Sequence, residues 1–307
     1  DAPAVSLINL YRMNNFFFQA AIGGEFDDND NPSIGVKFMN INYLLGKGWE
    51  LRAGQFDAMP FGRFPRTFDP SWIWPLEGTP KGMYALGLTN GDFGVMLQGA
   101  QYLGNSVLRS FFYITNGPTL DSSTGLIGAP IIADNNKYKM YGVRFSLSPY
   151  ALSNLEIGVN AAYTRGVGDT GTAFARVPLT MWAFDFNYAP TVESLDGFLR
   201  LRGQLNLVDL GNATYSGVNY KNNSSTYFAM VAYQPSMADS PFISKLMFST
   251  MLSHIQVPTG ADWGRPTDTQ YDLGVTYWFN WRTNLKFNYS LTQHEGNAFY
   301  IHLGIQI

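Results

Sequence analysis

Alternation of large apolar and polar residues, repeated in segments of about ten residues, is the feature that most constrains the fold. In residues 154–165 every second position is apolar, and that face carries Leu155, Ile157, Val159, Ala161 and Tyr163. Residues 179–190, 197–209, 284–293 and 298–307 follow the same pattern. An α-helix would place residues i and i+4 on one face, so these segments are predicted to be β-strands with one apolar and one polar face.

Nine further segments alternate less strictly, which gives fourteen candidate strands. They are 16–26, 34–45, 49–59, 92–103, 107–116, 138–149, 225–235, 242–255 and 270–280. Short turns, such as 46–48 and 104–106, alternate along the chain with long Gly-, Asn- and Pro-rich connections, such as 60–91 and 117–137. This alternation of short and long connections is typical of bacterial outer-membrane barrels, which have short periplasmic turns and longer external loops.

The fold expected from the sequence is therefore an all-β transmembrane antiparallel β-barrel of about 14 strands. Two segments, 4–12 and 81–90, are also strand-like, so 16 strands is the alternative. We expect residues 1–15 to form an N-terminal segment, periplasmic or luminal, and 16–307 to form a single barrel with a long external loop at 60–91. No linker divides the chain into further domains.

The composition favours a lipid environment for the apolar faces. Charged residues make up only 14% of the chain, against about a quarter in soluble proteins. Aromatic residues cluster near both ends of the expected strands, for example Trp49 and Tyr150 at the short turns and Tyr163 and Trp182 at the opposite ends. Such bands form where aromatic rings meet lipid headgroups. A soluble all-β carbohydrate-binding protein, using Trp72, Trp74 and Trp263, is the alternative.

A stretch of the chain resembles a known porin family. Residues 49–56 read Trp-Glu-Leu-Arg-Ala-Gly-Gln-Phe and 60–63 read Pro-Phe-Gly-Arg, while 94–99 and the Thr-Asn-Gly at 115–117 continue a strand-and-loop rhythm. This stretch, 49–117, resembles the phosphate-selective porin O/P-like family. The resemblance implies an outer-membrane porin in which a long loop begins after the strand at 49–59.

The polar faces of the strands are expected to line the lumen. The candidate pore-lining residues are Arg52, Arg109, Arg144, Arg200, Arg202, Lys245, Lys286, Glu50 and Asp185. These seven cations slightly outnumber the five acids expected on the polar faces, Glu25, Glu50, Glu156, Asp185 and Asp272, which predicts a mild anion preference. Arg200 and Arg202 have a structural alternative, since they could form an ion-pair ladder with the neighbouring Asp185.

The loop at 60–80 carries three candidate constriction residues, Arg63, Arg66 and Asp69, beside several large rings. Its apolar rings are expected to pack, either by folding into the lumen or by covering the mouth. In the first case the loop forms a constriction. In the second it is an external cap or a contact between protomers.

Nothing in the sequence suggests catalysis, a cofactor or a metal site. The three histidines belong to no recognisable catalytic or metal-binding motif, cysteine is absent, and a net charge of −3 without a basic run gives no reason to expect nucleic acid binding. The expected function is passive diffusion of small hydrophilic solutes or anions across a bacterial outer membrane, in contact with membrane lipid, and the expected assembly is a homotrimer. A structural outer-membrane barrel that anchors or encloses partner subunits is the alternative.

Overall fold

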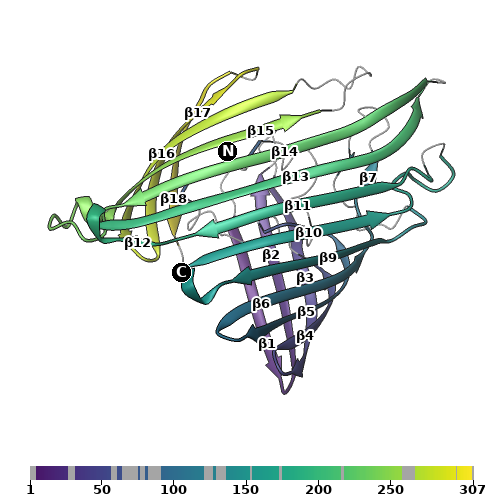
Figure 1. Ribbon diagram of the computed structural model, residues 1–307, viewed down its shortest axis with the longest axis horizontal. Helices are drawn as coiled ribbons and strands as arrows, with labels where there is room; N and C mark the ends of the chain where they lie inside the picture. Colours follow the sequence, from purple (N-terminus) through teal and green to yellow (C-terminus); the bar gives the residue numbers. More distant parts are fainter. Residues whose placement is uncertain are drawn as a thin grey trace.

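A computed structural model describes most of the chain. The described residues are 5–26, 32–56, 61–63, 75–76, 80–81, 91–120, 127–128, 136–152, 154–172, 175–215, 218–257, 267–294 and 296–305. Within them a 16-stranded sheet is antiparallel throughout, and its strands pair in chain order (Figure 1). The sheet curls from the purple strands through the teal to the yellow ones, into a barrel-like wall.

The wall strands follow the short turns and long connections of the sequence. They are β1 (Val5–Met13), β2 (Phe16–Phe26), β3 (Pro32–Gly46), β4 (Trp49–Gln55), β5 (Phe93–Leu103), β6 (Ser106–Thr115), β9 (Met140–Ser148), β10 (Leu155–Thr164), β11 (Leu179–Tyr188), β13 (Gly197–Tyr215), β14 (Val218–Gln234), β15 (Leu246–Gln256), β16 (Asp268–Asn280), β17 (Thr283–Thr292) and β18 (Ala298–Ile305). The two-residue β12 (Thr191–Val192) pairs only with β13. All fourteen strands expected from the sequence are present.

The remaining elements lie in the connections. β7 (Thr119–Leu120) and β8 (Ile127–Gly128) form a separate two-stranded sheet within the long connection after β6. Three single turns of 3₁₀ helix, η1 (Tyr150–Leu152), η2 (Glu193–Leu195) and η3 (Ile243–Lys245), lie at short turns of the wall. Among the described residues no helix is long and apolar enough to cross a membrane.

The structure corrects three expectations at the strand ends. Residues 5–13 pair along their length with β2, from Val5 with Gly24 to Met13 with Phe16, so most of the N-terminal segment is a wall strand rather than a separate unit. This strand and β12 bring the sheet to 16, the number left as the alternative. Of the other strand-like segment, 81–90, only Lys81 is described.

The second correction concerns the connection at 210–224. β13 extends to Tyr215 and β14 begins at Val218, so a long hairpin takes the place of the expected loop. The third concerns Lys245, expected to line the lumen. It lies in η3 at the short-turn end, exposed, with its Nζ 3.4 Å from the backbone oxygen of Phe279. Strand β15 begins only after this helical turn, so the alternation does not apply to Lys245.

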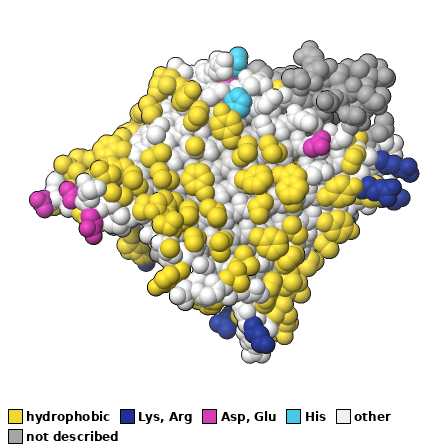
Figure 2. Space-filling view, viewed as in Figure 1, with side chains coloured by type: hydrophobic (Ala, Val, Ile, Leu, Met, Phe, Trp, Pro, Cys, Tyr) yellow, Lys and Arg dark blue, Asp and Glu magenta, His cyan; other side chains and the backbone are white. Residues whose placement is uncertain are grey.

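The two faces of the wall differ sharply in polarity. Along β9 and β11 buried and exposed residues alternate, and the exposed ones include Phe145, Trp182 and Phe184. Figure 2 shows hydrophobic side chains spread over the outer face. The buried face is rich in polar residues, including Asn42, Arg144, Asn206, Thr226 and Lys286. An apolar exterior around a polar interior is the arrangement of a transmembrane β-barrel.

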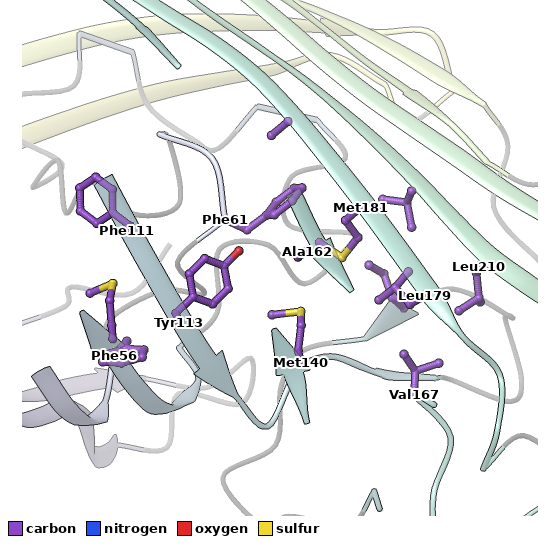
Figure 3. Close-up of a cluster of buried hydrophobic side chains, with 14 of the residues drawn as sticks. Phe56, Phe61, Phe111, Tyr113, Met140, Ala162, Val167, Leu179, Met181 and Leu210 are labelled. Carbon is purple, nitrogen blue, oxygen red and sulfur yellow. The ribbon is translucent and has the colours of Figure 1, made fainter. Parts of the chain in front are cut away.

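Part of the interior is filled by an apolar cluster. Phe61, from the long connection between β4 and β5, belongs to the same buried cluster as Tyr113, Ala162 and Met181 of the inner wall. Figure 3 shows the Phe61 ring among these side chains. The connection therefore enters the barrel at Phe61.

Candidate functional site on the inner wall

A buried arginine is the centre of the charged inner wall. Arg144 of β9 is 0% exposed, and its guanidinium donates to both carboxylate oxygens of Asp185 on β11, one of them at 2.8 Å. Glu156 of β10 lies 3.6 Å from the same guanidinium. Gly158, on the strand between, leaves the space that the guanidinium fills, because a Cβ there would lie 2.5 Å from Arg144 Nη2. Asp185 and Glu156 compensate the positive charge of Arg144, whose burial would otherwise be unfavourable.

The long connection is bound to this group through Arg63. Its Nη1 donates to Glu156 Oε2 at 2.8 Å, and its backbone N–H donates to Gln204 Oε1 at 3.0 Å. The preceding Gly62 adopts a positive φ of 74°, and a Cβ there would lie 2.3 Å from the Gln204 amide nitrogen. The connection thus lies directly against β10 and β13.

A second attachment joins the connection to β15 and β16. Lys81 Nζ lies 2.6 Å from Asp268 Oδ2 of β16, and its backbone N–H donates to Ser253 Oγ of β15 at 3.0 Å. The Thr276 hydroxyl of β16 donates to the backbone oxygen of Pro75 at 3.0 Å. Leu76 packs in a buried cluster with Phe228, Met230 and Met251.

The described parts of the connection, 61–63, 75–76 and 80–81, therefore lie inside the barrel. Of the three expected constriction residues, Arg63 reaches the inner wall, whereas Arg66 and Asp69 lie outside the described residues. The sequence did not single out Lys81 or Asp268. Lys81 lies within the long connection and Asp268 is the first residue of β16, and the alternation within strands does not predict which way such residues point.

The base of the connection is held by Asp92, which precedes β5. Phe56 N–H donates to the Asp92 backbone oxygen at 2.7 Å, which joins the two ends of the connection. The Asp92 carboxylate accepts hydrogen bonds from the N–H groups of Phe93 at 2.7 Å and Gly117 at 2.9 Å. Burial raises the pKa of Asp92 above its ordinary value of 3.8, although these hydrogen bonds oppose the shift.

Further arginines of the polar faces lie towards the short-turn end of the wall. Arg52 Nε donates to Asn42 Oδ1 at 2.7 Å, and its guanidinium lies 3.2 Å from Glu50. Arg109 donates to Ser148 Oγ at 2.9 Å. Arg202 donates to Asn187 Oδ1 at 2.9 Å, and Arg200 lies 5.7 Å from the centre of the Phe198 ring. Neither contact is with Asp185, the partner in the alternative ion-pair ladder, and the Asp185 carboxylate is bound by Arg144.

Lys286 and a group of amides and hydroxyls line the region of β16 and β17. Lys286 is 0% exposed and shares its face of β17 with Asn284, Asn288 and Ser290. The hydroxyl of Ser290 donates to Asp272 of β16, which also accepts hydrogen bonds from Gln270. Within the described ranges, no group of three or more His, Asp or Glu side chains is arranged to hold a metal ion.

No protein-family model and no curated protein matches the sequence. Solved structures match at the level of the fold. The outer membrane channel DcaP of Acinetobacter baumannii is similar with a TM-score of 0.60 and 13% identity, over 98% of this chain and 83% of that one. An anion-selective porin from Comamonas acidovorans gives 0.59 and 12% over the same shares. Salmonella typhi OmpF, in complex with daunomycin, gives 0.56 and 11%, over 98% and 88%.

These similarities show an outer-membrane porin fold. They agree with the apolar outer wall in placing the protein in the bacterial outer membrane, as the sequence predicts.

Proposed function

We propose that the chain is a passive diffusion pore for small hydrophilic solutes or ions. The observation that carries this proposal is the polarity of the two faces: charged and amide side chains line the inner wall, and large apolar side chains cover the outer one. Such an interior suits hydrated solutes, and such an exterior suits lipid. The three similar structures are a channel and two porins, which supports the same function.

A mild anion preference is the finer part of the proposal. Arg109 of the inner wall donates to the neutral Ser148, so this contact leaves its positive charge in place. One similar structure is an anion-selective porin, and residues 49–117 resemble phosphate-selective porins. The connection between β4 and β5 would narrow the pore beside the Arg63–Glu156 pair.

Single-channel recording in planar lipid bilayers tests both parts. We expect discrete conductance steps after insertion, and a reversal potential in a KCl gradient whose sign indicates that Cl⁻ is more permeant than K⁺. A clear cation preference would reject the selectivity. Folded protein that inserts without conductance would reject the pore itself.

A structural barrel is the second candidate, because apolar residues occupy part of the interior. Phe61 and Leu76, from the connection between β4 and β5, are both buried against the inner wall. A barrel filled in this way would anchor or enclose partners without conducting. Silent insertion of heat-modifiable, folded protein would favour it. Cross-linking in detergent tests the homotrimer that we propose for either function.

A further inference from the structure

The outer wall carries an apolar groove of about 590 Å³ that faces the membrane. Two rows of cross-strand neighbours form it. One row runs from Leu51 of β4 through Leu97, Phe112, Val143 and Ala161 to Trp182 of β11. The second row runs through Val95, Ile114, Tyr141, Tyr163 and Thr180. The groove is hollow because small side chains, such as Ala161 and Thr180, lie between large rings.

Basic side chains continue the same outward face towards the long-loop end. Lys139 lies two residues beyond Tyr141 on β9, and Arg165 lies two residues beyond Tyr163 on β10. The alternation of burial continues past the strand ends: Arg165 is exposed between the buried Thr164 and Gly166. The next outward position along β strands is about 7 Å away. These cations therefore lie just above the tyrosines of the groove.

Arg176 adds a third cation at the same edge. It is exposed, next to the buried Val177, and a backbone hydrogen bond of 3.0 Å from Val167 N–H to the Val177 oxygen joins its segment to that of Arg165. Figure 2 shows basic side chains beside the apolar surface, on the side where β9, β10 and β11 reach the long loops. Asp169, on the loop between Arg165 and Arg176, is also exposed.

We propose that this surface binds a phosphorylated, acylated lipid of the outer leaflet. An acyl chain would lie in the groove between Phe112, Tyr163 and Trp182, and the phosphate would lie against Lys139, Arg165 and Arg176. Apolar packing would then hold the acyl chain, and opposite charge would hold the phosphate of the same lipid. Both would act at the depth where the membrane meets water. Long-loop ends of outer-membrane barrels are external, which puts the cations at the outer leaflet.

The geometry of the neighbouring contacts supports a lipid phosphate. Lys139 Nζ donates to Asn116 Oδ1 at 2.9 Å, and the Arg165 guanidinium lies 5.6 Å from the centre of the Tyr138 ring. Asn116 lies two residues after Ile114 of the groove, so the Lys139 ammonium lies near the long-loop end of the groove. Guanidinium and ammonium groups both pair well with phosphate oxygens.

Binding to the full chain in a non-ionic detergent tests the proposal. Native mass spectrometry would measure the affinity for lipid A with two phosphates, for the same acylated disaccharide without phosphates, and for inorganic phosphate. We expect the bisphosphorylated lipid to bind at least about tenfold more tightly than the dephosphorylated one, and inorganic phosphate to leave it bound.

Two variants separate headgroup from acyl chain. The double variant Arg165→Gln/Arg176→Gln should weaken binding of the bisphosphorylated lipid about tenfold or more, with little effect on the dephosphorylated one. Ala161→Phe fills the groove and should weaken both. Arg282→Gln, which removes an exposed cation beside Trp281 at the short-turn end, and Ala229→Phe, on the outer face of β14, are the matched controls. Heat-modifiable gel mobility confirms that each variant is folded.

Equal losses in Arg282→Gln and the double variant would overturn the proposal, because binding would then reflect general charge attraction. Unchanged affinity in Ala161→Phe would overturn the acyl site, and displacement of the lipid by inorganic phosphate would reduce the site to a headgroup site. A change in oligomeric state without a change in lipid binding would assign the groove to a second copy of the chain, and would also overturn the proposal.

Discussion

Gly158 has no side chain, and this leaves room for the contact between Arg144 and Asp185. It lies beside Arg144, whose guanidinium binds both oxygens of Asp185. A buried arginine without its acids would be strongly destabilising, since an uncompensated charge would remain inside the wall. The glycine therefore matters through the ion pair that it accommodates.

Gly158→Ala is expected to displace the Arg144 guanidinium from Asp185. The added methyl group would lie 2.5 Å from Arg144 Nη2, and losing buried hydrogen bonds costs about 1–3 kcal/mol. The measurement is the urea dependence of the folded fraction, read from heat-modifiable gel mobility. Gly35→Ala is the control, because nothing lies within 4 Å of a Cβ at Gly35. Equal stability of the two variants would contradict the account.

Asp92 gives a pH dependence at the base of the long connection. Burial raises its pKa above 3.8, so the folded state favours the protonated carboxyl. This contribution to stability is full below the ordinary carboxyl pKa and is lost as the pH rises through the raised value.

We therefore expect the urea midpoint of the wild type to fall, relative to that of Asp92→Asn, as the pH is raised from about 3.5 upwards. Subtracting the variant's curve removes the contributions of other carboxylates. A difference that is flat, or that rises with pH, would show that the hydrogen bonds from Phe93 and Gly117 outweigh burial at this group.

At the scale of elements, the connection between β4 and β5 is joined to the wall by few but well-placed contacts. Arg63 pairs with Glu156 of β10, and Lys81 pairs with Asp268 of β16. The Arg63 and Glu156 side chains are 23% and 13% exposed, so both keep some contact with the lumen. Their charges act chiefly on what lies beside them in the lumen.

Arg63→Gln should lower the ratio of anion to cation permeability, and Glu156→Gln should raise it, because each removes one charge of opposite sign from the same place in the lumen. Reversal potentials in a KCl gradient measure both. Arg282→Gln at the short-turn rim is the control. Shifts of the same sign in both variants would indicate a rearranged connection instead of a local charge effect.

The strands themselves were predictable because apolar residues that face lipid alternate along each strand with polar residues that face water. The β13–β14 hairpin was only partly predicted, since residues 218–224 include three Asn and have no large apolar residue after Tyr220. For residues 4–12 the sequence allows either a wall strand or a periplasmic or luminal segment. The pairing of β1 with β2 shows that it is a wall strand. That pairing is a contact between strands, which no residue pattern within 5–13 specifies.

In the molecule as a whole, apolar side chains lie outside and polar ones inside, which is the reverse of a soluble β protein. Phe184 in the middle of β11 and Leu195 in the short-turn helix η2 are both 47% exposed. In water the two positions would be equivalent. In a bilayer Phe184 lies in the hydrocarbon, whereas Leu195 lies near the headgroups.

Phe184→Arg is therefore expected to cost about 2–4 kcal/mol in lipid vesicles, and Leu195→Arg about 0–1 kcal/mol. Reversible unfolding in urea, from vesicles, measures both. Equal costs would mean that the outer face of β11 does not contact lipid, and the barrel assignment would fail with it.

The sequence alone determined that the chain is a transmembrane barrel, and which residues face each way in most strands. The reason is local: side chains alternate across a strand, so lipid and water each select every second residue. Only the tertiary structure decided the partners of the inner charges. Arg144, Asp185, Glu156 and Arg63 come from four separate segments, and their meeting depends on strand register and on the path of a loop, which a period of two residues does not encode.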